Sequence, residues 1–158
     1  KIILSIPITK KSFFIGYKGS LEAYIYIWFS KQNSLVYVGE TNNIHGVVGR
    51  ADQHVSKGGT LYCRLHDAGY ELEELEDLML LSYPLPREKK FMSEETAYRI
   101  SVEYLVQKNL LRKRIDSHNP YKLISNVTPG PHVSMKRINK IAENIVNDFW
   151  EIYEEELL

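Results

Sequence analysis

Two short segments near the start of the chain, 23–29 and 34–39, are rich in tyrosine, isoleucine and valine, and only a few polar residues separate them. Aromatic and β-branched side chains favour extended backbone, and a short polar break between two such segments is typical of a β-hairpin. Because side chains alternate across a strand, every second residue points to the same side of the sheet. The hairpin therefore requires a sheet with two distinct faces, and this constrains the fold more than any other feature.

The turn of the hairpin decides which residues of the two strands lie opposite each other. With Lys31 and Gln32 at the centre of the turn, Tyr26 lies opposite Tyr37, and Gly39 leaves space beside the two phenol rings. The alternation places one set of side chains on a shared face: Tyr24, Tyr26, Trp28, Leu35, Tyr37 and Gly39. We therefore predict two neighbouring tyrosine side chains on one face of the sheet.

The rest of the chain alternates between helical and extended patterns, with turn residues between them. The expected elements are helices at 42–56, 60–68, 93–111 and 133–155, a third strand at 78–85, and a short extended segment at 123–126. Ser93 is the expected N-cap of the helix that follows it. These elements predict a small α/β (α+β) domain in which helices flank an antiparallel sheet of three strands and a further helix is added at the C-terminus.

We divide the chain into three expected parts. Residues 1–21 form an N-terminal extension packed on the domain, residues 22–130 form the domain itself, and residues 131–158 form an amphipathic helix with an acidic end. The 158 residues include a single cysteine, Cys63, which excludes an internal disulfide framework and a zinc site with several cysteine ligands. We expect Cys63 to be a small buried hydrophobic residue, in a chain that works in the reducing cytoplasm. The longest apolar runs are too short to cross a membrane, so no membrane partner is expected.

The charge of the chain is balanced overall but unevenly distributed. Twenty basic residues face 20 acidic ones, and six of the acids follow the last basic residue, Lys140. Residues 1–142 consequently hold 20 bases against 14 acids, a net charge of +6. One interpretation is an ordinary solvated surface with an acidic terminal helix. The other is a body that faces phosphates, with the lysines near the N-terminus and the basic stretch 108–122 contacting the backbone of a nucleic acid, and with the acidic helix away from the tyrosines.

Several polar residues follow the hairpin at characteristic intervals. Arg50 and His54 are four residues apart and so lie on one face of their expected helix. A guanidinium and an imidazole directed at one place suit the binding of a phosphate. Glu103 lies within a later helix, and Asn126 ends the short extended segment.

Taken in order, these residues resemble the GIY-YIG nuclease family. The likeness rests on Tyr24-Ile25-Tyr26, on Tyr37-Val38-Gly39 eleven residues after Tyr26, and on the polar residues just described, and it extends over about residues 22–126. Tyr24 stands where the family has its first glycine, and residues 46–49 resemble a short insertion before Arg50. These departures are more similar to the restriction-type or standalone branches of the family.

The resemblance implies a fold and an activity. The fold is a small three-stranded antiparallel sheet flanked by helices, and the activity is metal-dependent hydrolysis of DNA phosphodiester bonds by an endonuclease. Each active site cuts one strand, and the protein acts either as a homodimer or as a domain fused to one that selects the target.

The resemblance also implies roles for single residues. Tyr26 or Tyr37 is the general base for the attacking water, Arg50 grips the scissile phosphate, and His54 assists with the tyrosine proton or with the phosphate. Glu103 binds the divalent ion, Mg²⁺ or Mn²⁺, and Asn126 completes the site. An oxygen ligand set with one carboxylate suits Mg²⁺, which keeps several of its waters.

Simpler interpretations compete with these roles. Glu103 lies four residues after Arg99 and could be its salt-bridge partner, and Glu94 and Glu95 are alternative metal ligands. For the whole chain, one rival is a nucleic-acid-binding domain that keeps the fold without activity. A second rival is a protein-interaction module that uses the acidic C-terminal helix.

Overall fold

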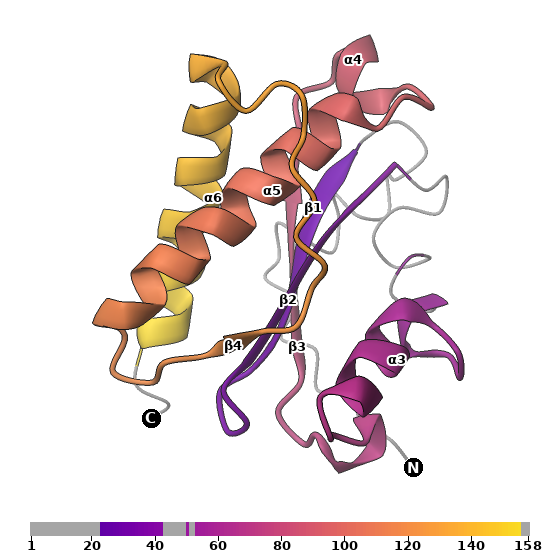
Figure 1. The fold of residues 1–158 in the computed structure, drawn as a ribbon, viewed down its shortest axis with the longest axis vertical. Coiled ribbons are helices and arrows are strands. Elements are labelled where there is room, and N and C mark those ends of the chain that lie inside the picture. The colour runs from indigo at the N-terminus through magenta and orange to yellow at the C-terminus, as the bar shows by residue number, and fades with distance from the viewer. Residues whose placement is uncertain (1–22, 43–49, 51–52, 156–158) are drawn as a thin grey trace.

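The computed structural model describes residues 23–42, 50 and 53–155. Its sheet has four strands in the order β3-β1-β2-β4, and Figure 1 labels each strand. The strands are β1 (Tyr24–Ser30), β2 (Leu35–Thr41), β3 (Met79–Pro84) and β4 (Lys122–Leu123). The three expected antiparallel strands are present, with β1 paired to both β2 and β3. The extended segment was expected at 123–126, and the structure has a short fourth strand there, β4, which begins one residue earlier, ends at Leu123 and runs parallel to β2.

The hairpin register differs from the predicted one. Tyr26 pairs with Gly39, and Trp28 pairs with Tyr37, so the predicted opposition of Tyr26 and Tyr37 is wrong by two residues. Two-residue hairpin turns need positive φ angles that favour glycine and asparagine. The chain instead uses a four-residue connection in which Ser34 alone has a positive φ, 52°. A shift of two residues leaves every side chain on its predicted face, and the predicted face composition is confirmed.

The helices are α3 (Thr60–Asp67), α4 (Lys89–Met92), α5 (Ala97–Lys113) and α6 (Lys136–Glu154), with short 3₁₀ turns at Leu72–Glu74 and Arg114–Asp116. Gly69, with φ of 87°, follows the end of α3, as expected for a helix C-terminus.

Two details of the predicted helices are wrong. Ser93 does not cap α5, because it follows α4, and α5 begins only at Ala97. Cys63 is exposed rather than buried. Of the helix predicted at 42–56, residues 50 and 53–55 are helical, and 43–49, 51 and 52 lie outside the described residues. The expected N-terminal extension 1–21 lies outside them too.

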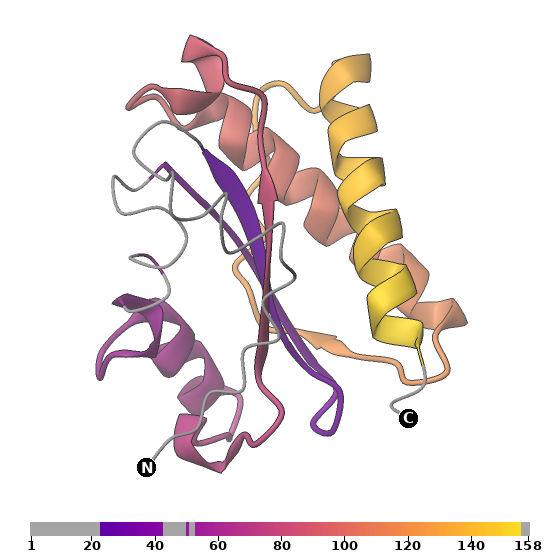
Figure 2. The ribbon, with the colours of Figure 1, turned by 180° about the vertical axis from the view of Figure 1, so that it is seen from behind.

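The sheet is covered on both faces, which explains why all seven residues of β1 are buried. Figures 1 and 2 show α5 and α6 on one side and α3 on the other. The odd-numbered residues of β1 pack with α5 and α6, and its even-numbered residues pack with α3. Both tyrosines of interest therefore face α3, and the expectation that the acidic α6 lies away from them is confirmed.

The C-terminal helix is an integral part of one core. Ile138, Ile145 and Phe149 of α6 are buried against the sheet and α5, and the Phe149 ring meets the ring of Phe29 edge-on, with 5.4 Å between centroids. At the far end of α6, Tyr153 donates a hydrogen bond to the backbone carbonyl of Asn119. Among the helices of the described residues, none is long and apolar enough to span a membrane.

Candidate active site

The site begins with two tyrosines from neighbouring strands of one sheet face. The rings of Tyr26 and Tyr37 are stacked, with 6.4 Å between centroids and 21° between planes. Gly39, directly across from Tyr26, makes room for its side chain. A Cβ atom at Gly39 would lie 2.2 Å from the Tyr26 hydroxyl oxygen, far inside van der Waals contact. Glycine is therefore required beside Tyr26 for steric reasons.

His54 connects the tyrosine pair to the next element of the chain. It is buried, with 1 % of its surface exposed, and its ring lies 5.2 Å from that of Tyr26 and 5.6 Å from that of Tyr37. Its Nε2 atom is 2.7 Å from the Tyr26 hydroxyl oxygen. Its Nδ1 atom accepts a hydrogen bond from the backbone N–H of Leu61, at 3.3 Å. Burial, followed by the charge of Arg50, lowers the pKa of His54 to about 4, so the imidazole is neutral near pH 7.

Arg50 supplies the positive charge next to the tyrosines. Its Nη1 donates to Gln53 Oε1 at 3.2 Å, and its buried Nε atom has no hydrogen-bond partner among the described residues. Burial raises the pKa of both Tyr26 and Tyr37, and the Arg50 guanidinium acts in the opposite direction on each. The positive charge of Arg50 therefore favours negative charge on a tyrosine oxygen or on a bound phosphate.

Glu103 reaches the same group of residues from α5. Burial, followed by the charge of the neighbouring Glu40 carboxylate, raises its pKa to about 8, while a hydrogen bond from Gln107 and the charge of Arg50 oppose the shift. Glu103 also raises the pKa of Tyr37 and of Tyr26. The Glu103 carboxyl group therefore interacts electrostatically with both tyrosines and with Arg50.

Arg99 is not the salt-bridge partner of Glu103. Its Nε donates instead to Glu40 Oε2 at 2.5 Å, and its Nη1 donates to the carbonyl oxygens of Phe91 and Ser93 at 2.8 and 2.7 Å. The competing ion pair of Glu103 with Arg99 is therefore not formed. The alternative ligands Glu94 and Glu95 are exposed and precede α5.

Asn126 joins the site through its backbone. The Gln107 amide Nε2 donates both to Glu103 Oε1, at 3.2 Å, and to the Asn126 carbonyl oxygen, at 3.0 Å. The side chain of Asn126 is exposed. Gln107 thus holds the segment after β4 against the carboxylate of α5.

A family model for the GIY-YIG catalytic domain matches residues 22–104, slightly more than half of the chain. The chain belongs to the GIY-YIG family. It is therefore a nuclease-type domain, and DNA is the substrate that this family implies. No curated protein and no solved structure matches the chain.

The matched residues of this GIY-YIG domain include both tyrosines, Arg50, His54 and, almost at the end of the match, Glu103. Asn126 lies beyond it. Ring contacts and a hydrogen bond join Tyr26, Tyr37 and His54, and the charges of Arg50 and Glu103 act on both tyrosines. The Asn126 carbonyl is linked to Glu103 through Gln107.

The donor groups around Glu103 fit a divalent metal ion. The Glu40 carboxylate raises the pKa of Glu103 although Glu40 is itself paired with Arg99, and a metal ion bound to Glu103 would offset this repulsion. The amide oxygen of Gln107 is buried without a hydrogen-bond partner among the described residues. Oxygen donors of this kind suit Mg²⁺ or Mn²⁺. In the described part of the chain, no three histidine, cysteine, aspartate or glutamate side chains gather as a metal-binding group. Mg²⁺ usually keeps several waters and takes further ligands from substrate phosphates.

Sequence reasoning missed three residues that support the site: Glu40, Arg99 and Gln107. The position of Glu40, directly after Gly39 in β2, was a usable signal, because it places a carboxylate at the end of a strand that carries a candidate base. Gln107 follows Glu103 by four residues and so shares its helix face. No local sequence pattern could have identified Glu40 as the partner of Arg99, because the two residues are 59 positions apart.

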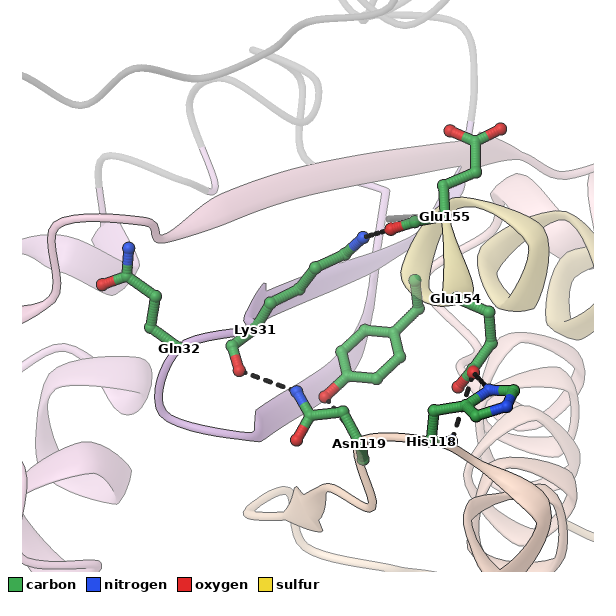
Figure 3. A pocket seen from close by; sticks show the side chains of 7 residues that line it. Lys31, Gln32, His118, Asn119, Glu154 and Glu155 are labelled. Atoms are coloured by element: carbon green, nitrogen blue, oxygen red, sulfur yellow. Dashed lines mark hydrogen bonds and ion pairs between the residues drawn. The ribbon is translucent and has the colours of Figure 1, made fainter. Parts of the chain in front are cut away.

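A separate hollow lies at the turn end of the hairpin, away from the tyrosine hydroxyls. It has a volume of about 290 Å³ and is lined by Lys31, Gln32, His118, Asn119 and residues 153–155. Figure 3 shows Lys31 extending toward the Glu155 backbone and His118 beside Glu154, whereas the Gln32 side chain points away from the others. Lys31 Nζ donates to the Glu155 carbonyl at 2.6 Å, and Asn119 Nδ2 donates to the Lys31 carbonyl at 2.8 Å. The first bond fastens the hairpin to the end of α6 and the second fastens it to the segment between α5 and β4, which is a structural role.

Proposed function

We propose that this domain is a metal-dependent endonuclease that hydrolyses DNA phosphodiester bonds, with one active site cutting one strand. The observation that carries the proposal is the convergence of two buried tyrosines, a neutral histidine, an arginine and a carboxylate within a GIY-YIG catalytic domain. A tyrosine with a pKa of about 10 is a poor base at neutral pH. A neighbouring cation favours its deprotonated form, and groups directed at a phosphate stabilise the charge that develops on it.

The chain's own residues divide the work. Arg50 binds the scissile phosphate and stabilises the charge that develops on it. A tyrosine oxygen, Tyr26 or Tyr37, receives the proton of the attacking water once the nearby positive charge has made its deprotonated form accessible. Asn126 completes the site from its exposed rim.

Glu103 would hold the divalent ion, with Gln107 fixing the orientation of its carboxylate. When bound, Mg²⁺ or Mn²⁺ supplies a Lewis acid that polarises the phosphate and stabilises the leaving oxygen. Since the domain provides one set of these residues, a double-strand cut would need a second copy or a second binding event. A homodimer, or fusion to a domain that selects the target, would meet that need.

The test is cleavage of supercoiled plasmid with and without Mg²⁺ or Mn²⁺. We expect metal-dependent nicking that is lost in Tyr37→Phe, Arg50→Ala and Glu103→Gln. The matched controls are Arg137→Ala and Glu94→Gln, which make the same changes at exposed positions of α6 and of the segment before α5, and they should cut normally.

The rival functions give different results in the same assay. Plasmid binding without cutting in any divalent metal would indicate a domain that keeps the fold and binds DNA only. Absence of binding even at low salt would instead favour a protein-interaction module that uses the acidic α6.

A further inference from the structure

His54 uses both of its ring nitrogens, and its two partners are of different kinds. At Nδ1 the partner is the backbone N–H of Leu61, 3.3 Å away. At Nε2 the partner is the hydroxyl of Tyr26, 2.7 Å away. A backbone N–H can only donate, whereas a tyrosine hydroxyl can donate or accept. The pair of contacts therefore restricts where the imidazole can carry its proton.

The Leu61 amide belongs to the first turn of α3, which begins at Thr60. The first N–H groups of a helix have no partner inside the helix. The N-cap residue here is Gly59, which has no side chain that could accept a hydrogen bond from them. The Nδ1 lone pair of His54 takes that place. The positive end of the helix dipole also disfavours a proton on the nitrogen that faces it.

The approach of α3 to His54 depends on Gly59. A Cβ atom at that position would lie 2.6 Å from the His54 carbonyl oxygen and 2.2 Å from that of Gln53. Only glycine lets the chain turn this closely. The sequence Gly58-Gly59 therefore both ends the helix that carries His54 and presents the Leu61 N–H to its ring.

The ring carries one proton near neutral pH. His54 is buried, and among the described residues the charged or titratable groups around it are Arg50 on its own helical segment and Tyr26 and Tyr37 on the sheet. Both burial and Arg50 disfavour a second proton. Because Nδ1 must accept from Leu61, the single proton is left for Nε2.

We infer that His54 is held as its Nε2–H tautomer by the Leu61 amide, and that it donates a hydrogen bond to the oxygen of Tyr26. His54 is then a positioning residue that cannot take the proton of Tyr26, because Nε2 is already protonated. It stabilises negative charge on the Tyr26 oxygen and directs the hydroxyl proton of Tyr26 away from the imidazole. This inference deepens the proposed function and gives His54 one of the two roles that the sequence left open, the one that acts on the tyrosine.

The direct test is a nitrogen-15 spectrum of the whole protein with labelled histidines at pH 7, which reports the protonation of each ring nitrogen. His54 is assigned by the signal that disappears in His54→Gln. We expect one fixed tautomer with Nε2 protonated and Nδ1 unprotonated, and the same tautomer in Tyr26→Phe, because Leu61 sets it. Free histidine in the same buffer shows how a mixture of tautomers looks. A proton on Nδ1, a mixture of tautomers, or a doubly protonated ring would overturn the inference.

A second test uses side chains that imitate one ring nitrogen each. The amide of His54→Gln reaches the Nε2 position and can still donate to Tyr26, whereas that of His54→Asn reaches only Nδ1, and His54→Leu can donate to neither. We expect cleavage within about tenfold of wild type for glutamine and a loss of about 100-fold or more for asparagine and leucine. Equal loss in all three, with folding verified by circular dichroism, would contradict a donor role. Failure of the wild type to cut DNA would overturn the proposed function, while the nitrogen spectrum would still decide the tautomer.

Discussion

Gly39 lies directly opposite Tyr26 in the sheet, and the phenol group of the tyrosine occupies the space that a side chain at Gly39 would need. The glycine of the second family motif thus has a local steric purpose. It allows a catalytic candidate on one strand to lie flat against the next strand, with its hydroxyl beside His54.

Replacing Gly39 with alanine should displace the Tyr26 hydroxyl, because the new methyl group would overlap it. We expect Gly39→Ala to reduce cleavage about 100-fold or more, and to lower the free energy of unfolding by about 1–3 kcal/mol through overpacking. Plasmid nicking and urea unfolding measure the two effects. Gly69→Ala is the control. The alanine would have to keep a backbone φ of 87°, which strains it, but its Cβ would contact no neighbouring atom. It should cost stability alone, and a similar loss of cleavage there would show that instability explains both variants.

Arg99 and Glu40 form a buried ion pair, with 2 % and 18 % of the side chains exposed. Arg99→Met should lower the free energy of unfolding by about 3–5 kcal/mol, because Glu40 and several backbone carbonyls lose their partner. The matched control is Arg137→Met, which breaks the more exposed pair with Glu88 and should cost about 0–1 kcal/mol. Chemical denaturation of both variants gives the comparison. Equal losses would mean that the Arg99 pair is no more than a surface interaction.

Local sequence patterns predicted which face of the sheet each strand residue occupies, but not the register of the hairpin. Strand alternation placed Tyr26 and Tyr37 on one face correctly, because that pattern is local and survives a shift of two residues. The register itself was wrong because it depends on the conformation of residues 31–34, where Ser34 adopts the positive φ.

Contacts between distant segments were the part that could not be predicted. Periodicity located α5, but it gave Arg99 a neighbour one turn along the helix, Glu103, as partner. The fold instead gives it Glu40 and several carbonyl groups that end α4 or lead into α5. The contact of Leu61 with His54 is of the same kind, since it depends on the close turn at Gly59.

The neutral state of His54 predicts a pH dependence of stability. Its pKa is about 4 in the folded chain and about 6.5 in an unfolded one, so between these values the unfolded chain binds more protons. Stability is then fully present above pH 6.5 and falls as the pH drops toward 4. From pH 6.5 to 5 this should lower the free energy of unfolding of the wild type by about 1.5 kcal/mol relative to His54→Gln.

The wild type is compared with His54→Gln because Glu103 makes stability depend on pH in the opposite direction. The pKa of Glu103 is raised from 4.5 to about 8, so between these pH values the folded chain binds more protons, and its stability falls as the pH rises toward 8. This contribution is present in both proteins and cancels in the difference. Urea unfolding at several pH values measures it, and parallel curves for the two proteins would contradict the assignment of a neutral, buried His54.

Phe149 tests whether α6 supports the fold without taking part in the site. It is fully buried among Phe29, Tyr121 and Tyr153 on the face of the sheet away from Tyr26. Phe149→Ala should lower the free energy of unfolding by about 3–5 kcal/mol, because it leaves a cavity. The nicking rate per folded molecule, measured well below the melting temperature, should stay within about threefold of wild type, which is a change of about 0.6 kcal/mol in the activation free energy. A larger loss of cleavage would indicate that the α6 face communicates with the site.

Glu103 predicts a metal effect that does not require DNA. A ligand that binds only the folded chain stabilises it, by about 1.4 kcal/mol at ten times its dissociation constant. Mg²⁺ should therefore raise the melting temperature of the wild type and of Glu94→Gln, and EDTA should reverse the rise. Glu103→Gln should not respond, because the amide cannot supply the negative charge that offsets the dehydration of the ion. Without metal, the same variant should be at least as stable as the wild type at pH 8, since it removes a buried carboxylate that lies beside Glu40. A Mg²⁺ response in Glu103→Gln equal to that of the wild type would place the metal elsewhere.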